Sequence, residues 1–286
     1  MQQFLRNIGE ILEMIKIGHS VLALPFAFMG AMLAARGWPD WRTSFFILLA
    51  MVAARSAAMA FNRLADAPFD ATNPRTSSRS LPQGRIKSGA VILFVIVNSL
   101  VFIWAAAQLN RVCLALSPLA LVVILGYSLT KRFTSATHFI LGLSLGLAPV
   151  GGWLAVRGDL SMQVLVLAMS VLFWVAGFDI LYALQDEEFD RQTGLWSLPA
   201  RLGSLWARRL AAGCHLAAAG GFLLTGYLAG LQGVYTLAAL LGAVLLAIQH
   251  LILSLRGPLR LPPAFFTLNG LVGIGLAVAT WVSLIS

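Results

Sequence analysis

The stretch FNRLADAPFD, residues 61–70, ends a long apolar run. It places three oxygen-bearing side chains, Asn62, Asp66 and Asp70, at four-residue intervals. A spacing of four advances a helix by about 400°, so these side chains form a narrow polar stripe on one face if the helix continues that far. Pro68 could bend or end the helix, so the position of Asp70 depends on how the chain passes this proline.

The apolar run in front of this stripe is one of many, and together they indicate an integral membrane protein. The 286 residues are 59% hydrophobic and only 11% charged, and the mean hydropathy is +0.85. Charged residues make up about a quarter of soluble domains. Since roughly 20 apolar residues of helix cross a bilayer core, we expect an all-α bundle of about nine transmembrane helices. The predicted spans are residues 15–36, 43–64, 89–108, 112–130, 137–156, 162–183, 208–229, 233–255 and 264–285.

The formal charge of +9 follows the predicted topology and does not indicate a nucleic-acid-binding surface. Fourteen of the 20 Lys and Arg residues lie at the N-terminus and in alternate loops, and four lie on the opposite side. The remaining two, Arg55 and Arg63, lie within the second span. By the positive-inside rule, the N-terminus and the long loops face the cytoplasm and the C-terminus lies outside. We therefore expect membrane lipid around the chain and no nucleic-acid partner.

A second copy of the stripe occurs in LYALQDEEFD, residues 181–190, where Tyr182, Asp186 and Asp190 repeat the spacing 120 residues later. Each copy ends a span and opens a long loop, and the two spans are four apart in order. Because an even number of spans preserves direction, both stripes reach the same side of the membrane and can face each other. We expect a single transmembrane domain, residues 1–286. Its repeated halves are residues 15–130 and 137–255, followed by a final helix, 264–285.

Four carboxylates brought together by the two stripes would repel one another unless cations held them. Hard oxygen ligands with open coordination positions suit Mg²⁺, which usually binds through one or two carboxylates and substrate phosphates. One stripe alone would be read as a solvated helix end, but two at matched depth favour a metal site. The sequence therefore predicts an Mg²⁺-diphosphate site at the cytoplasmic membrane boundary. Its predicted metal ligands are Asn62, Asp66, Asp70, Asp186 and Asp190.

Basic residues close to the stripes are candidates for binding the diphosphate. Arg75 follows the first stripe, and Lys131 and Arg132 open another cytoplasmic loop. Arg can contact phosphate bidentately and Lys offers a point charge, although positive loops are also expected from topology alone. Tyr182 is assigned to the same diphosphate site. Arg55 lies two helical turns deeper than the first stripe, where a substrate carboxylate or one of the protein's own acids could pair with it.

With these residues the chain resembles the UbiA-type aromatic prenyltransferases of membranes. The first family signature, an Asn followed by Asp at four and eight residues, is matched by the stripe that starts at Asn62, and the preceding Arg by Arg55. The second, a Tyr and two Asp residues followed by a basic residue, Gly and Ser, is matched by YALQDEEFDRQTGLWS, residues 182–197. The stretches NPRTSSRSLPQG, LGYSLTKRFT and LGLAPVGGWLAV resemble the bacterial 4-hydroxybenzoate polyprenyltransferases or their menaquinone-pathway relatives. The resemblance covers nearly the whole chain, with one departure, since many members have Asp where this chain has Arg63.

The resemblance implies Mg²⁺-dependent transfer of a polyprenyl group from polyprenyl diphosphate to a ring carbon of a small aromatic acid, such as 4-hydroxybenzoate. It implies a multi-pass enzyme of the cell inner membrane, active at the cytoplasmic face, in ubiquinone or menaquinone biosynthesis. Asp66, Asp186 and Asp190 are then the catalytic carboxylates, and either Asp186 or Asp190 could take the proton that the acceptor releases. A membrane transporter that uses intramembrane carboxylates is the alternative, although the stripes lie at loop junctions and not at the midplane.

Overall fold

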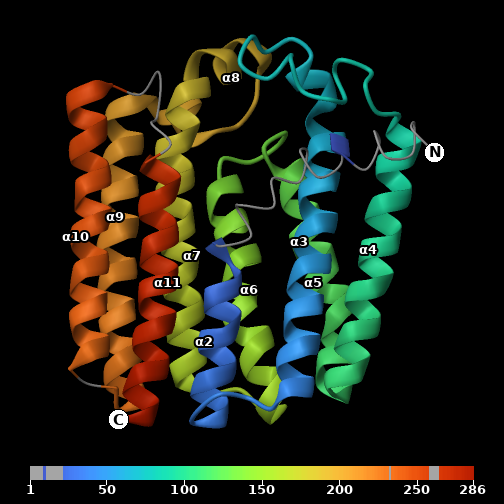
Figure 1. Ribbon diagram of the computed structural model, residues 1–286. Coiled ribbons are helices and arrows are strands. Elements are labelled where there is room, and N and C mark those ends of the chain that lie inside the picture. The colour runs from blue at the N-terminus through green and yellow to red at the C-terminus, as the bar shows by residue number, and fades with distance from the viewer. Residues whose placement is uncertain (1–8, 11–21, 232, 258–263) are drawn as a thin grey trace.

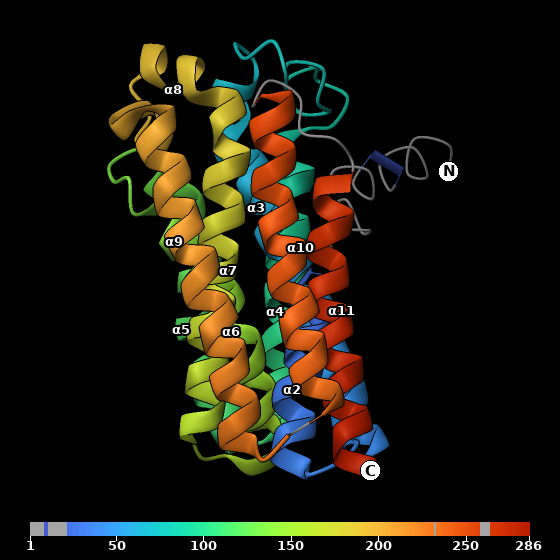
Figure 2. The ribbon, with the colours of Figure 1, turned by 90° about the vertical axis from the view of Figure 1, so that its left-hand side faces the viewer.

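The computed structural model describes residues 9–10, 22–231, 233–257 and 264–286, and the regular structure in these ranges is helical, with no strand (Figure 1). The elements are α2 (Leu24–Ala35), α3 (Trp41–Asp70), α4 (Ser88–Leu109), α5 (Arg111–Thr130), α6 (Thr137–Arg157), α7 (Met162–Ala183), the 3₁₀ turn η2 (Leu184–Asp186), α8 (Glu187–Thr193), α9 (Leu198–Ala229), α10 (Val234–Arg256) and α11 (Ala264–Ile285). The long helices stand side by side in one bundle, with α8 at one end and the C-terminus at the other (Figures 1 and 2).

The helices confirm the predicted all-α membrane bundle. In the described ranges, eight are long and apolar enough to cross a membrane, and they coincide with the last eight predicted spans. The shorter apolar helix α2 lies within the first predicted span, of which residues 15–21 are outside the described ranges. Large apolar side chains such as Leu100, Leu216 and Leu237 are exposed on the bundle surface. Lipid tails can cover such a surface, whereas a soluble monomer rarely leaves so much apolar area exposed.

The helix α9 begins at Leu198, well before the predicted start of its span near residue 208. Ser197 caps this helix by accepting a hydrogen bond from a first-turn amide, and Pro199 lies in the first turn. Both are helix-start signals that hydropathy does not register. Gly203, with φ 78° and ψ 160°, then kinks the helix before its apolar part.

Helices α2 and α6 pack closely because glycine faces backbone at their contact. A Cβ atom placed on Gly152 would lie 1.9 Å from the carbonyl oxygen of Ala27, and one on Gly30 would lie 2.0 Å from that of Pro149. Small residues allow this kind of close backbone approach between membrane helices. A Cβ atom placed on the neighbouring Gly151 would have no other atom within 4 Å. The requirement for glycine is therefore specific to one face of α6.

The core around α7 fixes the helix that leads into the second polar stripe. Trp174 on α7 is fully buried, and its ring centroid lies 5.1 Å from that of Phe26 on α2. Phe222 on α9 also stacks on Phe26, with ring centroids 5.9 Å apart. The indole Nε1 of Trp174 donates a hydrogen bond of 2.9 Å to Oδ1 of Asn269 on α11. Three helices thus hold α7 in place.

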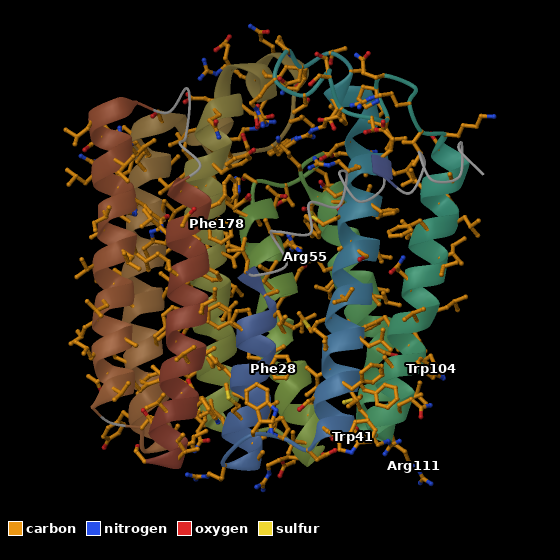
Figure 3. The ribbon with its side chains drawn as sticks, viewed as in Figure 1. Phe28, Trp41, Arg55, Trp104, Arg111 and Phe178 are labelled. Carbon is orange, nitrogen blue, oxygen red and sulfur yellow. The ribbon has the colours of Figure 1, made fainter. Side chains whose placement is uncertain are left out.

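Aromatic side chains gather at the end of the bundle opposite α8. Figure 3 shows Phe28, Trp41 and Trp104 there, above Arg111. Trp41 and Trp104 are exposed. Trp residues favour the level of the lipid head groups, so this belt is consistent with the second membrane surface.

Candidate active site

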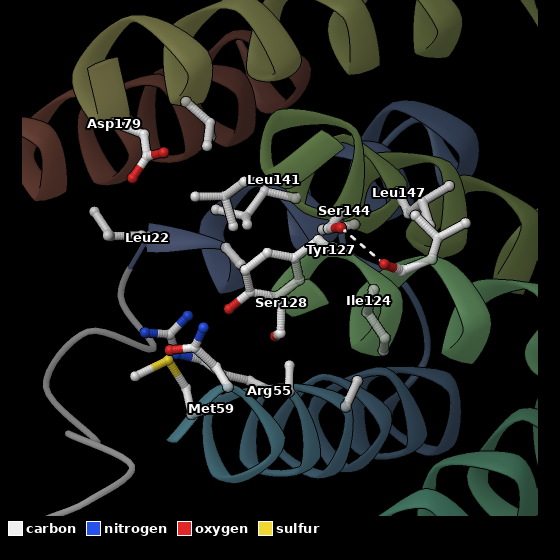
Figure 4. A pocket seen from close by; sticks show the side chains of 18 of the residues that line it. Leu22, Arg55, Met59, Ile124, Tyr127, Ser128, Leu141, Ser144, Leu147 and Asp179 are labelled. Atoms are coloured by element: carbon white, nitrogen blue, oxygen red, sulfur yellow. Dashed lines mark hydrogen bonds between the residues drawn. The ribbon is translucent and has the colours of Figure 1, made fainter. Parts of the chain in front are cut away.

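One elongated cavity of about 650 Å³ lies inside the bundle between α3, α5, α6 and α7 (Figure 4). Its lining follows α3 from Ile47 to Asp70, which corresponds to roughly 35 Å of helix. The part near the end of α3 is polar, and it includes the carboxylates of both stripes. The deeper part is apolar and is lined by side chains such as Ala27, Leu109 and Leu154. The cavity therefore joins a charged end to a long apolar interior.

The first stripe lies on a continuous helix, as the spacing predicts. Helix α3 continues past Pro68 and ends at Asp70. Its last turn is closed by a hydrogen bond of 3.1 Å from the amide of Ala71 to the carbonyl oxygen of Ala67. The side-chain amide of Asn62 donates to Asp66 Oδ2 at 3.1 Å.

The carboxylate of Asp70 is compensated by a cation from the following loop. Arg79 Nη1 lies 2.7 Å from both oxygens of Asp70, which is buried. Arg63, the residue that departs from the family pattern, lines the same cavity.

Unlike the first stripe, the second stripe does not lie on one continuous α-helix. Helix α7 ends one residue after Tyr182, the turn η2 carries Asp186, and α8 carries Asp190. Asp186 has φ −108° and ψ 7°, outside the helical region, and stands at the N-cap of α8. Its carboxylate accepts no capping hydrogen bond from the described residues, but a negative charge is favoured at the positive end of the helix dipole, and this favours a new helix starting there. All three side chains nevertheless line the cavity.

Asp186 is held by groups from the loop after α3. Arg75 Nε donates to Asp186 Oδ1 at 2.9 Å, and its Nη2 donates to Oδ2. Asn73 Nδ2 donates to the same carboxylate at 3.2 Å, while Asn73 Oδ1 accepts from the backbone amide of Arg75 and so orients that residue. Arg75 Nη1 also donates to the hydroxyl of Tyr182, at 3.1 Å. Burial lowers the pKa of Arg75, but these contacts outweigh it and raise that pKa above its ordinary value.

Asp190 is fully buried, and neither of its carboxylate oxygens accepts a hydrogen bond from the described residues. Lys131 Nζ approaches Oδ1 to 2.8 Å, an ion-pair distance whose direction lies outside hydrogen-bond geometry. The amide of Trp196 donates to the Lys131 carbonyl at 2.7 Å and ties the two loops together. A buried carboxylate with unused lone pairs is costly, so this position fits a further cation.

The described residues contain no group of three or more His, Cys, Asp or Glu side chains that could hold a metal alone. The unused carboxylate oxygens of Asp190, beside the other acids of the cavity, are donors that fit a hard cation such as Mg²⁺, which usually binds through one or two carboxylates and substrate phosphates.

Arg132 is the predicted diphosphate-binding residue that the structure does not bring to the cavity. Its Nη2 donates to the backbone carbonyl of Ala65 at 2.6 Å, and its guanidinium lies 5.6 Å from the ring centroid of Phe69. These contacts fix the loop after α5 against the end of α3. Arg75, Lys131 and Tyr182 do line the cavity.

Arg55 lines the middle of the cavity and does not pair with an acid in the described part of the chain. Its Nε is buried without a hydrogen-bond partner there, and no carboxylate oxygen of those residues lies within 4 Å of it. The residue projects from α3, while Asp179 projects from α7 on the other side of the cavity (Figure 4).

Sequence reasoning missed several cavity residues that come from other helices. They are Asn73, Tyr127, His138 and Asp179. A signal was present for Asp179, because a carboxylate inside an otherwise apolar span is unusual and commonly functional. The others are ordinary polar residues whose role appears only when the helices are packed.

The model of the UbiA prenyltransferase family matches residues 23–271. A 4-hydroxybenzoate octaprenyltransferase from Methylobacillus flagellatus is 34% identical over 66% of this chain, and the match spans 64% of that protein's length. A protein of the same name from Vibrio cholerae is 27% identical, and the match covers 96% of this chain and 98% of that one.

Solved structures give the same result for the fold. The apo structure of a UbiA homolog from Aeropyrum pernix is 32% identical, has a TM-score of 0.82, and covers 94% of this chain and 98% of its own. A UbiA homolog from Archaeoglobus fulgidus, bound to GPP and Mg²⁺, has a TM-score of 0.76 at 18% identity, covering 97% of this chain and 100% of its own. At that identity the second likeness concerns the fold alone.

Proposed function

This chain belongs to the UbiA prenyltransferase family, whose model matches residues 23–271, and is a prenyltransferase; from this premise we propose that it transfers a polyprenyl group from polyprenyl diphosphate to an aromatic acid. The observation that carries the proposal is the single cavity that joins the acidic stripes to a long apolar interior. A prenyl diphosphate has the same division into a charged head and an apolar chain. The similar proteins named 4-hydroxybenzoate octaprenyltransferase support 4-hydroxybenzoate, or a related quinone precursor, as the acceptor.

The diphosphate is proposed to lie between the two stripes. Asn62, Asp66 and Asp70 would hold metal from one side, and Asp186 and Asp190 from the other. Bound Mg²⁺ would neutralise the charge that develops on the leaving diphosphate.

The cations now paired with these acids have a second role in the proposal. Arg75 and Lys131 lie against the carboxylates, so they can exchange those partners for phosphate oxygens when substrate and metal arrive. Tyr182, within reach of Arg75, supplies a hydroxyl at the same position.

The prenyl chain is proposed to occupy the apolar part of the cavity. Breaking its bond to diphosphate leaves an allylic cation, which water would destroy, and the apolar lining of this part of the cavity limits that loss. Arg55 would hold the carboxylate of the acceptor through paired hydrogen bonds and so orient the ring beneath the reacting carbon.

The proposed setting is the inner membrane of a cell that makes ubiquinone or menaquinone, with the active site facing the cytoplasm. The distribution of Lys and Arg among the loops supports this orientation.

The test is direct. Purified protein in detergent is incubated with a polyprenyl diphosphate, Mg²⁺ and a panel of aromatic acids, and lipid extracts are analysed by mass spectrometry. We expect a prenylated hydroxybenzoate whose formation requires Mg²⁺ and stops when the metal is chelated. If no covalent product forms while proteoliposomes show proton-coupled flux of a small solute, the protein is a transporter and the proposal is wrong.

A further inference from the structure

A buried histidine and a carboxylate form a pair in the cavity, away from the two stripes. His138 lies in the first turn of α6, and its Nδ1 is 2.6 Å from Oδ2 of Asp179 on α7. The His138 side chain is almost completely buried, whereas 26% of the Asp179 side chain is accessible. Both residues line the cavity, so the accessible part of Asp179 belongs to its interior.

A third contact determines which nitrogen of His138 carries the proton. The backbone amide of Leu198, at the start of α9, donates to His138 Nε2 at 3.2 Å. This amide is one of the N–H groups that every helix leaves unpaired at its first turn. Because Nε2 accepts this bond, the ring proton is on Nδ1, and His138 donates it to Asp179. His138 is thereby held as a neutral donor, and Asp179 as a carboxylate.

Asp179 differs from the stripe carboxylates in what surrounds it. Asp70, Asp186 and Asp190 each lie within 4 Å of an Arg or Lys side chain, and Asp66 accepts from Asn62. Asp179 accepts a bond only through Oδ2, and its Oδ1 has no partner among the described residues. A carboxylate fixed through one oxygen and free at the other, in a cavity, is arranged to accept a proton from a bound molecule.

The depth of Asp179 matches the acceptor position. Asp66 and Asp186 are the middle residues of the two stripes. Asp179 lies seven residues before Asp186, whereas Arg55 lies eleven residues before Asp66. Arg55 is therefore deeper than Asp179 by four residues, which is about 6 Å along a helix. A benzene ring with two para substituents spans a comparable length. An aromatic acid whose carboxylate contacts Arg55 would therefore present a para hydroxyl at the level of Asp179, on the side nearer the diphosphate.

We propose that Asp179 is the catalytic base that takes the hydroxyl proton of the aromatic acceptor, and that His138 is the residue that positions it. The proposal rests on the proposed prenyl transfer, and it replaces Asp186 and Asp190 as the expected proton acceptors, since in the proposed function these two hold the metal when substrate is bound.

The bonds and charges in this step balance. As the bond from carbon to diphosphate breaks, the electron pair leaves with diphosphate, and the ring carbon next to the hydroxyl forms the new bond to the prenyl carbon. The hydroxyl proton passes to Asp179 Oδ1, which yields a dienone whose ring is uncharged and whose carboxylate stays at Arg55. The ring carbon then loses its proton to diphosphate, and Asp179 returns its proton to the oxygen, which restores the aromatic phenol.

The test compares Asp179→Asn with Asp159→Asn, which removes an exposed carboxylate near the opposite end of the bundle. Asparagine can still accept from His138 but cannot take a proton. For Asp179→Asn we expect kcat to fall by about 10²–10⁴-fold with saturating acceptor, the usual range for losing a general base. The donor Kd, from a separate titration, should stay within about twofold. The Asp159→Asn control should match the wild-type protein in both measurements.

A series of acceptors separates a base from a structural residue. Ring fluorine makes the phenol more acidic, so the ratio of wild-type to Asp179→Asn rates should shrink along a series of fluorinated 4-hydroxybenzoates. An equal loss for every acceptor, or a kcat within about threefold of wild type, would overturn the role of Asp179. If Asp179→Asn does not bind donor, Asp179→Ser takes its place in the same series. A wild-type protein that forms no prenylated product would instead overturn the proposed function itself.

Discussion

Arg55 is a cation that lines the cavity and has no ion pair with a described carboxylate, and its Nε is buried without a hydrogen-bond partner among the described residues. An unpaired charge inside a membrane bundle is expensive and is usually retained for a ligand. We predict that Arg55→Gln raises the KM for the aromatic acid by about 10–100-fold, the loss expected for a charge-assisted hydrogen bond. The Kd for polyprenyl diphosphate, measured by titration without acceptor, should change little.

The matched control for this prediction is Arg111→Gln, because Arg111 is exposed at the far end of the bundle (Figure 3). This variant should behave as wild type. Equal weakening of donor and acceptor binding by Arg55→Gln would show that Arg55 only holds the helices together.

Asp66 and Asp186 test the metal site, one from each stripe. We predict that Asp66→Ala and Asp186→Ala each lower kcat by about 10²–10³-fold, since each removes stabilisation of the developing diphosphate charge. Asn62→Ala should cost less because a neutral ligand stabilises this charge more weakly. The measurement is turnover at saturating Mg²⁺, on protein shown to be monodisperse. Glu188→Ala, which removes an exposed acid between Asp186 and Asp190, should keep full activity. Normal Mg²⁺-dependent turnover in Asp66→Ala or Asp186→Ala would refute the assignment.

Spacing along the sequence was sufficient to find side chains that share a helix face, but not those that meet from different helices. The first stripe and Arg55 lie on one helix, α3, where four-residue and seven-residue intervals return to one face. The second stripe lines the same cavity although its helix breaks at Asp186, which spacing did not predict. His138 and Asp179 are 41 residues apart and meet only through the packing of α6 on α7. Lys131 and Arg132 are neighbours in sequence, yet only Lys131 reaches the cavity, since adjacent side chains point in different directions.

At the scale of the elements, α2 and α6 show how little space separates the helices around the cavity. We predict that Gly152→Ala lowers the free energy of unfolding by about 1–3 kcal/mol, because a Cβ atom there would clash with the Ala27 carbonyl and force the helices apart. Thermal unfolding in detergent measures this effect. Gly151→Ala is the control, since its new methyl group meets open space and should leave the unfolding temperature nearly unchanged.

Hydropathy predicted the number and order of the helices better than their ends. Composition is sufficient to identify a membrane span, because every such span must cross the same apolar core with a long enough stretch of apolar helix. The early start of α9 depends on the capping hydrogen bond of Ser197, and the break at Asp186 depends on the start of a new helix, so both are local effects within polar sequence. The relation between the two halves of the bundle remains a prediction from the repeat.

The orientation of the whole molecule can be tested with single cysteine labels in a variant whose two native cysteines are replaced. We predict that labels at Ser78 and Gln192 react with a membrane-impermeant reagent from the cytoplasmic side only, and that a label at Ser286 reacts from outside. All three positions are exposed. Ser197 is unsuitable because it is fully buried and caps α9. A cytoplasmic Ser286 would mean that the number of membrane crossings is even.

The pairing of the cavity charges has a consequence for how the chain is made. Asp70 and Arg79 are nine residues apart, so they can neutralise each other as soon as that loop leaves the ribosome. Arg75 can pair with Asp186 only after another 111 residues have been synthesised, and Lys131 can pair with Asp190 only after the second half has been made. During synthesis Arg75 and Lys131 therefore lack these acid partners, and in the proposed orientation their positive charge helps to keep the loops of the first half in the cytoplasm. When the second half has been made, the carboxylates of Asp186 and Asp190 pair with these two cations. A chain that stops after α5 should accordingly insert with the same orientation as the complete protein, and a glycosylation reporter fused at residue 135 would reveal any inversion.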